Sequence, residues 1–144
     1  MTRIFGLITI ALTLGTGCTE YEGDLVGPRG GVVMSEDGHF MLEIPAGALE
    51  QPIEITIDEV ECQRPESVGP CYELGPIGLP LLTPGRITYA LGPEMLDGVD
   101  IDELGLLAER DDGWSRLADR EVDRKDEIVT GSAVYLSAFE IVRE

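Results

Sequence analysis

Residues 39–44 read His-Phe-Met-Leu-Glu-Ile, and residues 53–58 read Ile-Glu-Ile-Thr-Ile-Asp. In each stretch the apolar side chains that share one face occupy every second position: Phe40, Leu42 and Ile44 in the first, and Ile53, Ile55 and Ile57 in the second. Polar side chains, among them Glu54, Thr56 and Asp58, fall on the other face. A period of two is typical of a strand with one face buried and one in water. The two stretches therefore predict two half-buried β-strands.

Further short strands are predicted on both sides of these two. They are Val32–Met34, Tyr72–Leu74, Arg86–Leu91, Leu104–Ala108, Trp114–Leu117, Ile128–Leu136 and Phe139–Val142. Proline and glycine lie in nearly every gap between them, and Asp37-Gly38 is a hairpin turn signal. Only residues 100–107 offer a helical turn as an alternative. Several short strands at roughly 8–12-residue spacing indicate an all-β sandwich or barrel.

The start of the chain differs from the rest in composition. Arg3 is followed by an uncharged apolar run from Ile4 to Leu14, and then by the small residues Gly15, Thr16 and Gly17. This is the layout of a secretory signal peptide, and the run is too short to span a bilayer comfortably. Residues 1–17 are therefore predicted to be a signal for export.

The residue that follows this run is a cysteine. Gly17-Cys18 resembles the cleavage site of bacterial lipoproteins, in which the cysteine carries a diacylglyceryl group. Two or three acyl chains hold a protein stably on a membrane. The same resemblance, with Thr19 instead of aspartate after the cysteine, implies an outer-membrane location on the periplasmic or cell-surface face. Residues 18–28 are predicted to be a flexible tether, and residues 29–144 the folded domain.

The chain has three cysteines: Cys18, Cys62 and Cys71. If Cys18 carries lipid, Cys62 and Cys71 remain as a pair in an oxidising compartment, where they are predicted to form a disulfide. A zinc site needs more ligands than two cysteines and the single histidine, His39. No cofactor is expected.

The formal net charge is −18, from 28 acidic and 10 basic residues. Such a surface repels nucleic-acid phosphates, so we do not expect this chain to bind nucleic acid. It suits solubility, a basic partner or a divalent cation. The acidic residues Asp97, Asp100, Asp102 and Glu103 form a candidate calcium site, although their spacing matches no EF-hand loop.

Three clusters of residues resemble the ZU5 family. They are Gly30-Gly31-Val32-Val33 with Asp37-Gly38 and the element Ile44-Pro45-Ala46-Gly47-Ala48-Leu49; Gly75-Pro76-Ile77-Gly78 through Leu82-Thr83-Pro84 and Ile87-Thr88-Tyr89; and Gly113-Trp114, Leu117 and residues 133–139. The resemblance implies an antiparallel β-sandwich and a non-catalytic role in protein–protein interaction, adhesion or scaffolding. From the residues themselves we expect the Pro45–Gly47 segment to be a corner after which Leu49 returns to the core.

Some ZU5 proteins cleave themselves at a His-Phe-Ser sequence, which gives one alternative to a non-catalytic role. The matching residues are Tyr135, Leu136 and Ser137, so cleavage would fall between Leu136 and Ser137. The serine is present, but a tyrosine stands in place of the histidine and is a poor base near neutral pH. The sequence therefore predicts a protein that is not an enzyme, with self-cleavage at Ser137 or calcium stabilisation as the alternatives.

Overall fold

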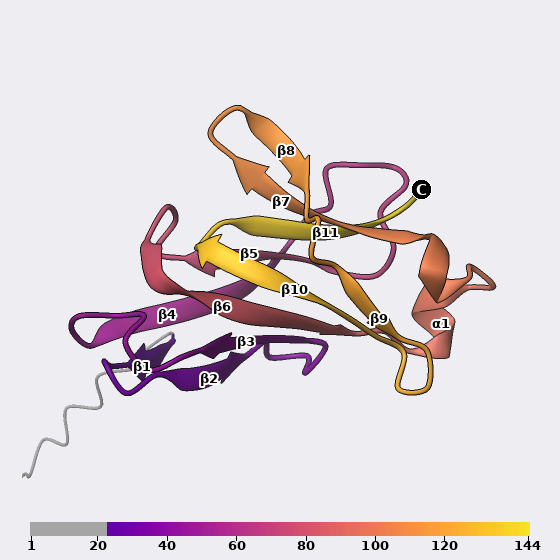
Figure 1. Cartoon of the computed structure of the whole chain (residues 1–144). Helices are drawn as coiled ribbons and strands as arrows, with labels where there is room; N and C mark the ends of the chain where they lie inside the picture. Colours follow the sequence, from indigo (N-terminus) through magenta and orange to yellow (C-terminus); the bar gives the residue numbers. More distant parts are fainter. Residues whose placement is uncertain (1–22) are drawn as a thin grey trace, which may run out of the picture.

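The computed structural model describes residues 23–144, and Figure 1 shows the fold. The predicted signal peptide (residues 1–17), the lipidation site at Cys18 and the first part of the predicted tether lie outside the described residues. None of the helices within residues 23–144 is long and apolar enough to cross a membrane.

The chain folds into two antiparallel sheets that pack face to face. The first has the strand order β1-β4-β5-β11-β7-β8. Its strands are β1 (Asp24–Val26), β4 (Ile53–Val60), β5 (Cys71–Gly75), β11 (Ala138–Arg143), β7 (Leu104–Arg110) and β8 (Gly113–Arg116). The second has the order β2-β3-β6-β10-β9, with strands β2 (Gly31–Met34), β3 (Phe40–Ile44), β6 (Pro80–Ala90), β10 (Ile128–Tyr135) and β9 (Glu121–Asp123). The predicted all-β antiparallel sandwich is confirmed.

The alternation that predicted the fold is realised in β3 and β4. Phe40, Leu42 and Ile44 are buried between the sheets. In β4 only Ile55 is fully buried, and Ile53 and Ile57 pack against the core while half-exposed. This difference arises because β4 lies second from the edge of its sheet, where the facing layer gives less cover.

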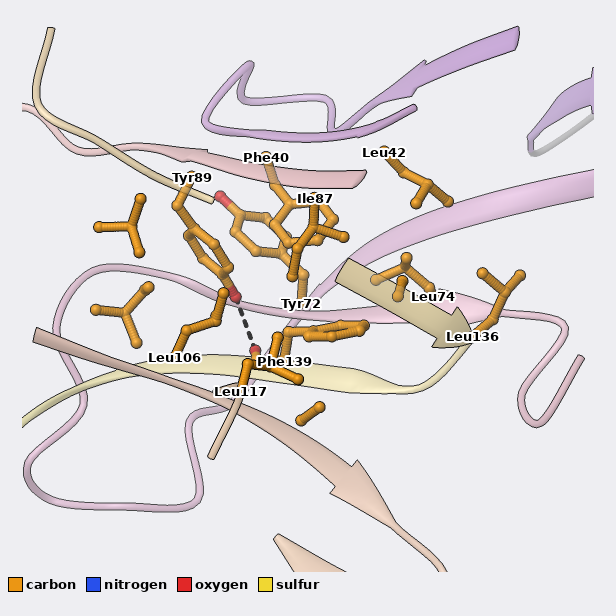
Figure 2. Close-up of a cluster of buried hydrophobic side chains, with 14 of the residues drawn as sticks. Phe40, Leu42, Tyr72, Leu74, Ile87, Tyr89, Leu106, Leu117, Leu136 and Phe139 are labelled. Carbon is orange, nitrogen blue, oxygen red and sulfur yellow. Dashed lines mark hydrogen bonds between the residues drawn. The ribbon is translucent and has the colours of Figure 1, made fainter. Parts of the chain in front are cut away.

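The centre of the core is a group of four aromatic rings. The ring of Phe40 lies 4.9 Å from that of Tyr72, 4.8 Å from that of Tyr89 and 6.2 Å from that of Phe139, between centroids. Figure 2 shows Tyr89, from the second sheet, donating a hydrogen bond to the backbone oxygen of Phe139 in the first, at 2.9 Å. Because the hydroxyl is buried, this bond satisfies a polar group that would otherwise destabilise the core. It also joins the two layers.

The corner after β3 is confirmed. Gly47 has a φ of +84°, a conformation that glycine adopts without steric penalty. Its N–H donates to the carbonyl of Pro28 at 2.9 Å, and Ala48 and Leu49 return to the core with exposures of 1% and 4%. The element therefore has a packing role.

The predicted tether boundary at residue 28 is wrong. Asp24–Val26 form β1, which pairs with Ile53–Ile55 of β4, and Val26 is buried. The strand has only three residues, two of them the apolar Leu25 and Val26, and the polar residues before it give the segment the composition of a tether. The folded domain thus reaches at least to Asp24 rather than beginning at residue 29.

Three other elements differ from prediction. Strand β6 begins at Pro80 rather than at Arg86. Its first residues are not yet paired with β3, and their register with β10 is shifted. Pro80 and Pro84 therefore do not interrupt a regular ladder of hydrogen bonds. Strand β9 was not predicted, because its residues are mostly charged. Within residues 100–107 only Ile101–Glu103 form a 3-10 turn, and the short helix α1 (Pro93–Leu96) precedes it.

Candidate functional site

The loop between β4 and β5 carries the predicted disulfide. Cys62 and Cys71 are bonded, with their Cα atoms 5.3 Å apart. The loop that they close lies beside β11, where Ser67 pairs with Val142 in an antiparallel bridge: the N–H of Val68 donates to the carbonyl of Ile141 at 2.8 Å and that of Arg143 to the carbonyl of Glu66 at 3.0 Å. The disulfide therefore fastens the loop to β11, and Gln63 and Ser67 of the loop cover the outer face of that strand at Glu140.

Glu140 of β11 lies beneath this cover and is only 2% exposed. Its carboxylate accepts hydrogen bonds from the N–H of Gln63 at 2.8 Å and from the hydroxyl of Ser67 at 3.2 Å. The Nε atom of Arg64 lies 3.9 Å from the same carboxylate. A buried carboxylate is tolerated when its oxygens are hydrogen-bonded, so Glu140 positions the disulfide loop on the sheet.

A groove of about 470 Å³ opens between this loop and the β7–β8 hairpin. Leu107 and Val142, both nearly buried, form its apolar floor. The guanidinium carbon of Arg64 lies 5.6 Å from the centroid of the Trp114 ring, a cation–π distance. The disulfide loop and the hairpin both project at the top of Figure 1.

Two further arginines line the groove, and each meets a carboxylate of the same chain. Arg116 pairs with Glu144 at 2.9 Å and Arg143 with Glu103 at 3.5 Å. Glu66 also lines it. The groove therefore combines an aromatic ring, three guanidinium groups and an apolar floor.

Of the residues proposed for self-cleavage, Leu136 and Ser137 are buried and Tyr135 is partly exposed. Ser137 is 5% exposed, and its hydroxyl donates to the carbonyl of Ala138 at 3.4 Å. The hydroxyl of Tyr135 points elsewhere and donates to the carbonyl of Glu109 at 3.4 Å. Neither contact activates the serine as a nucleophile.

The single histidine is also distant from Ser137. His39 Nδ1 lies 2.9 Å from the carbonyl of Ala90, at one end of β6, whereas Tyr135 pairs with Pro80 at the other end. A strand of this length spans roughly 30 Å at ~3.3 Å per residue. The structure therefore does not bring a histidine to Ser137.

The four residues of the candidate calcium site each have separate roles. Asp100 accepts from the N–H of Asp102 at 3.0 Å, while Asp102 pairs with Arg124 and Glu103 with Arg143. Asp97 ends helix α1 in a left-handed conformation. Within residues 23–144 no three acidic, histidine or cysteine side chains form a group that could hold a metal ion.

A second polar cluster joins the sheets at the β2–β3 turn. Asp37 accepts hydrogen bonds from the Ser35 hydroxyl at 2.6 Å, the His39 N–H at 3.0 Å and the Tyr72 hydroxyl at 2.6 Å. Partial removal from water raises the pKa of Asp37, but these hydrogen bonds outweigh it and hold that pKa below its ordinary value. Burial, with the hydrogen bond to Asp37, raises the pKa of Tyr72, so its phenol stays neutral and donates.

Replacing Asp37 should make the free energy of unfolding less dependent on pH in the acidic range. A carboxyl whose pKa is lower in the folded state stabilises the fold above about pH 4 and loses this contribution as the pH falls through the folded-state value. We expect Asp37→Asn to reduce the free energy of unfolding by about 1 kcal/mol at pH 7, since the carboxylate is partly exposed, and by less at pH 3. Urea titrations at both pH values measure this difference. Asp112→Asn, an exposed control, should change neither value; an equal loss at both pH values for Asp37→Asn would contradict the assignment.

Neither models of known protein families nor curated proteins give a match to this chain. The likeness to ZU5 domains therefore rests on the three clusters of residues described above, and it enters the functional interpretation as a proposal.

The groove, with its arginines and Trp114, was not predicted from the sequence. Leu107, Arg116 and Val142 come from neighbouring strands, and Arg64 joins them from the disulfide loop, which is distant in sequence. The one available signal was compositional: basic residues are rare in this acidic chain, and Trp114 is its only tryptophan.

Proposed function

We propose that this chain is a lipid-anchored protein of the bacterial cell envelope, and that its ZU5-like β-sandwich is a non-catalytic module that binds a partner protein. Cys18 carries the lipid, and the outer membrane is the proposed location. Adhesion, assembly and scaffolding are the roles that this arrangement serves.

The observation that carries the proposal is the Cys62–Cys71 disulfide. Structural disulfides persist in oxidising compartments outside the cytoplasm. The bond therefore agrees with the export signal expected at residues 1–17, which was inferred from different residues. Both observations favour an envelope location.

The arrangement of the first sheet supports a binding role for an anchored domain. Five residues separate Cys18 from Asp24, the first residue of β1. Even fully extended, this stretch keeps β1 within about 20 Å of the lipid. Strand β8 lies at the opposite edge of the same sheet, five strand positions from β1. At the usual spacing between neighbouring strands, this separates β8 from β1 by roughly 24 Å. Figure 1 shows the two edges at opposite sides of the molecule, so the groove beside β8 is presented away from the anchored edge.

The ZU5-like part of the proposal is supported by where the resembling residues lie. The element Ile44–Leu49 forms a corner of the sandwich, and the cluster near the end of the chain supplies β10 and β11. Sandwich domains bind partners through loops and sheet edges. The disulfide loop and the edge of β8 are such features.

Lipid attachment is tested by metabolic labelling with a fatty acid. Wild-type protein should carry the label and fractionate with membranes, whereas Cys18→Ala should lose the label and move to the soluble fraction, because a single thiol is the acceptor. A variant in which Cys62 and Cys71 are both replaced by serine serves as a matched control and should keep the label. Label on the Cys18→Ala protein, or none on the wild type, would overturn the anchoring.

A further inference from the structure

We infer that one end of the sandwich lies against the lipid bilayer to which Cys18 anchors the chain, with the apolar side chains of Ile77 and Leu82 inserted among the lipids. This inference rests on the proposed lipid anchor and names the surface that the anchored domain contacts. The opposite end of the sandwich, which carries the disulfide loop, is then directed away from the membrane.

Four connecting segments form this end of the sandwich, which we call the loop end: residues 27–30, 45–52, 76–82 and 134–137. Backbone hydrogen bonds join each segment to a neighbour: Gly47 N–H donates to Pro28 at 2.9 Å, Leu82 N–H to Ala48 at 3.0 Å and Gly78 N–H to Leu136 at 2.8 Å. Figure 1 shows the β1–β2 turn and the β5–β6 turn on the left of the molecule, and helix α1 on the right. The four segments therefore form one surface at one end of the strands.

Exposed apolar side chains gather at the loop end. Within residues 23–144, six large apolar side chains are between 42% and 65% exposed. Five of them lie in the loop end or within two residues of it: Leu25, Val32, Ile77, Leu82 and Val134. The sixth, Met34, lies farther along β2. Apolar side chains gathered on one part of a surface mark a site of contact with a protein or a membrane.

The loop end is also nearly free of charged side chains, although the net charge of the chain is −18. Its four segments contain one arginine and one glutamate, Arg29 and Glu50. At the opposite end, residues 94–103 hold five acidic side chains and no basic one. The N–H of Ala90 donates to the carbonyl of His39 at 2.8 Å, which places the residues after β6 beside the β2–β3 turn. Because charges are unfavourable in a bilayer, the loop end suits contact with lipid and the opposite end does not.

The acidic turn between β7 and β8 lies apart from the apolar side chains of the loop end. It carries Asp111 and Asp112, but β8 is the far edge of the first sheet, five strand positions from β1. Figure 1 shows the β7–β8 hairpin at the top of the molecule and β1 at the lower left. The bilayer therefore contacts the β1 side of this end, and the two aspartates stay in water.

The backbone of the β5–β6 turn is suited to contact with lipid. An N–H group without a partner is unfavourable in a bilayer, because no water is present to accept its hydrogen bond. Pro76 and Pro80, which have no N–H, flank the turn that carries Ile77. Within it, the N–H groups of Gly78 and Leu79 donate to backbone carbonyls at 2.8 Å and 3.1 Å. The turn therefore presents Ile77 with few backbone donors that need water.

The position of Cys18 brings the bilayer close to the loop end. Strand β1 runs from Asp24 toward this end, and Gly27, where the loop end begins, lies roughly 10 Å beyond Asp24. The stretch from Cys18 to Asp24 spans up to about 20 Å. Asp24 pairs with Ile55, and β4 continues from there to Val60 at the opposite end, roughly 17 Å away. The anchor thus reaches the loop end with slack, whereas the opposite end lies near the limit of its reach.

Brominated lipids test this arrangement, because bromine on the acyl chains quenches only an indole that lies close to the apolar layer. The lipidated full chain carrying Ile77→Trp and Trp114→Phe is reconstituted into vesicles of phosphatidylcholine with brominated acyl chains. Apolar side chains at a membrane surface reach a depth of roughly 5–10 Å, so this indole should be quenched relative to vesicles without bromine. Glu36→Trp with Trp114→Phe places the indole on the exposed β2–β3 turn at the opposite end and should show no quenching.

Two charged variants locate the contact in the Ile77→Trp protein. Leu82→Glu should reduce the quenching at least about twofold, because a carboxylate beside Ile77 resists entry into the bilayer. Met34→Glu adds the same charge at a similarly exposed apolar residue outside the loop end and should leave the quenching unchanged. Equal quenching of the Ile77→Trp and Glu36→Trp proteins, or equal effects of Leu82→Glu and Met34→Glu, would overturn the inference.

Flotation of the same samples separates this inference from the anchoring proposal. Protein that does not float with the vesicles contradicts the lipid anchor, whereas protein that floats without quenching of the Ile77→Trp indole contradicts only the contact proposed here. A second copy of the chain is the other occupant that the test detects. Emission of the Ile77→Trp indole that shifts with protein concentration in the Cys18→Ala full chain, without vesicles, would show self-association through the loop end and overturn the inference.

Discussion

Phe40→Ala is expected to reduce the free energy of unfolding by about 3–5 kcal/mol, the range found when a large aromatic side chain is removed from a core. Phe40 is 0% exposed, and its ring contacts the rings of Tyr72, Tyr89 and Phe139 from both sheets. The backbone around this group cannot close the cavity, because β3 is paired on both sides, to β2 and to β6. Figure 2 shows how the ring fills the space between the layers. Urea titration followed by far-UV circular dichroism measures the loss.

Two variants make this prediction specific to the cavity. Phe40→Leu keeps most of the apolar volume and should lower the free energy of unfolding by less than half as much as Phe40→Ala. It can also be measured if the alanine variant does not fold. Met41→Ala alters the neighbouring side chain on the opposite face of β3 and should cost less than 1 kcal/mol. Equal losses at Phe40 and Met41 would contradict the packing described for β3.

The parts of the fold that the sequence predicted are those in which each strand carries its own burial pattern. Phe40, Leu42 and Ile44 alternate with the less buried Met41 and Glu43, and Ile87 and Tyr89 are separated by Thr88, because each strand has one face in the core and one facing outward. The corner at Gly47 was predictable for a similar reason, since its backbone requirement is local. Strands β1 and β9 were missed because each has only three residues, too few for an alternating pattern to be recognised.

The groove could not be predicted in the same way, because its residues are brought together by tertiary structure. Glu140 stands between apolar neighbours in β11 and reads as a residue on the water-facing side of the strand. It is nevertheless buried, because the disulfide loop covers that side of the sheet. Alternation indicates which face a side chain occupies, but it does not tell what covers the face.

The second large effect is expected from removing the disulfide with Cys62→Ser and Cys71→Ala together. The closed loop spans a sequence separation of 9 residues, for which loop-closure entropy gives about 2–3 kcal/mol of stability. Release of the loop also weakens the hydrogen bonds that Glu140 accepts from Gln63 and Ser67, which leaves a carboxylate beside apolar β11 residues. We therefore expect a total loss at or above the upper end of that range, measured by urea titration.

The wild-type chain unfolded in the presence of a reductant is the control, because it loses the bond without a change of side chains. In both proteins the fluorescence emission of Trp114 should also change, since Arg64 lies over the Trp114 ring only while the loop is fastened to β11. Unchanged stability after removal of the bond would show that the loop is held by Glu140 and the backbone alone. Lower stability with unchanged Trp114 emission would show instead that Arg64 keeps its place beside the ring without the disulfide.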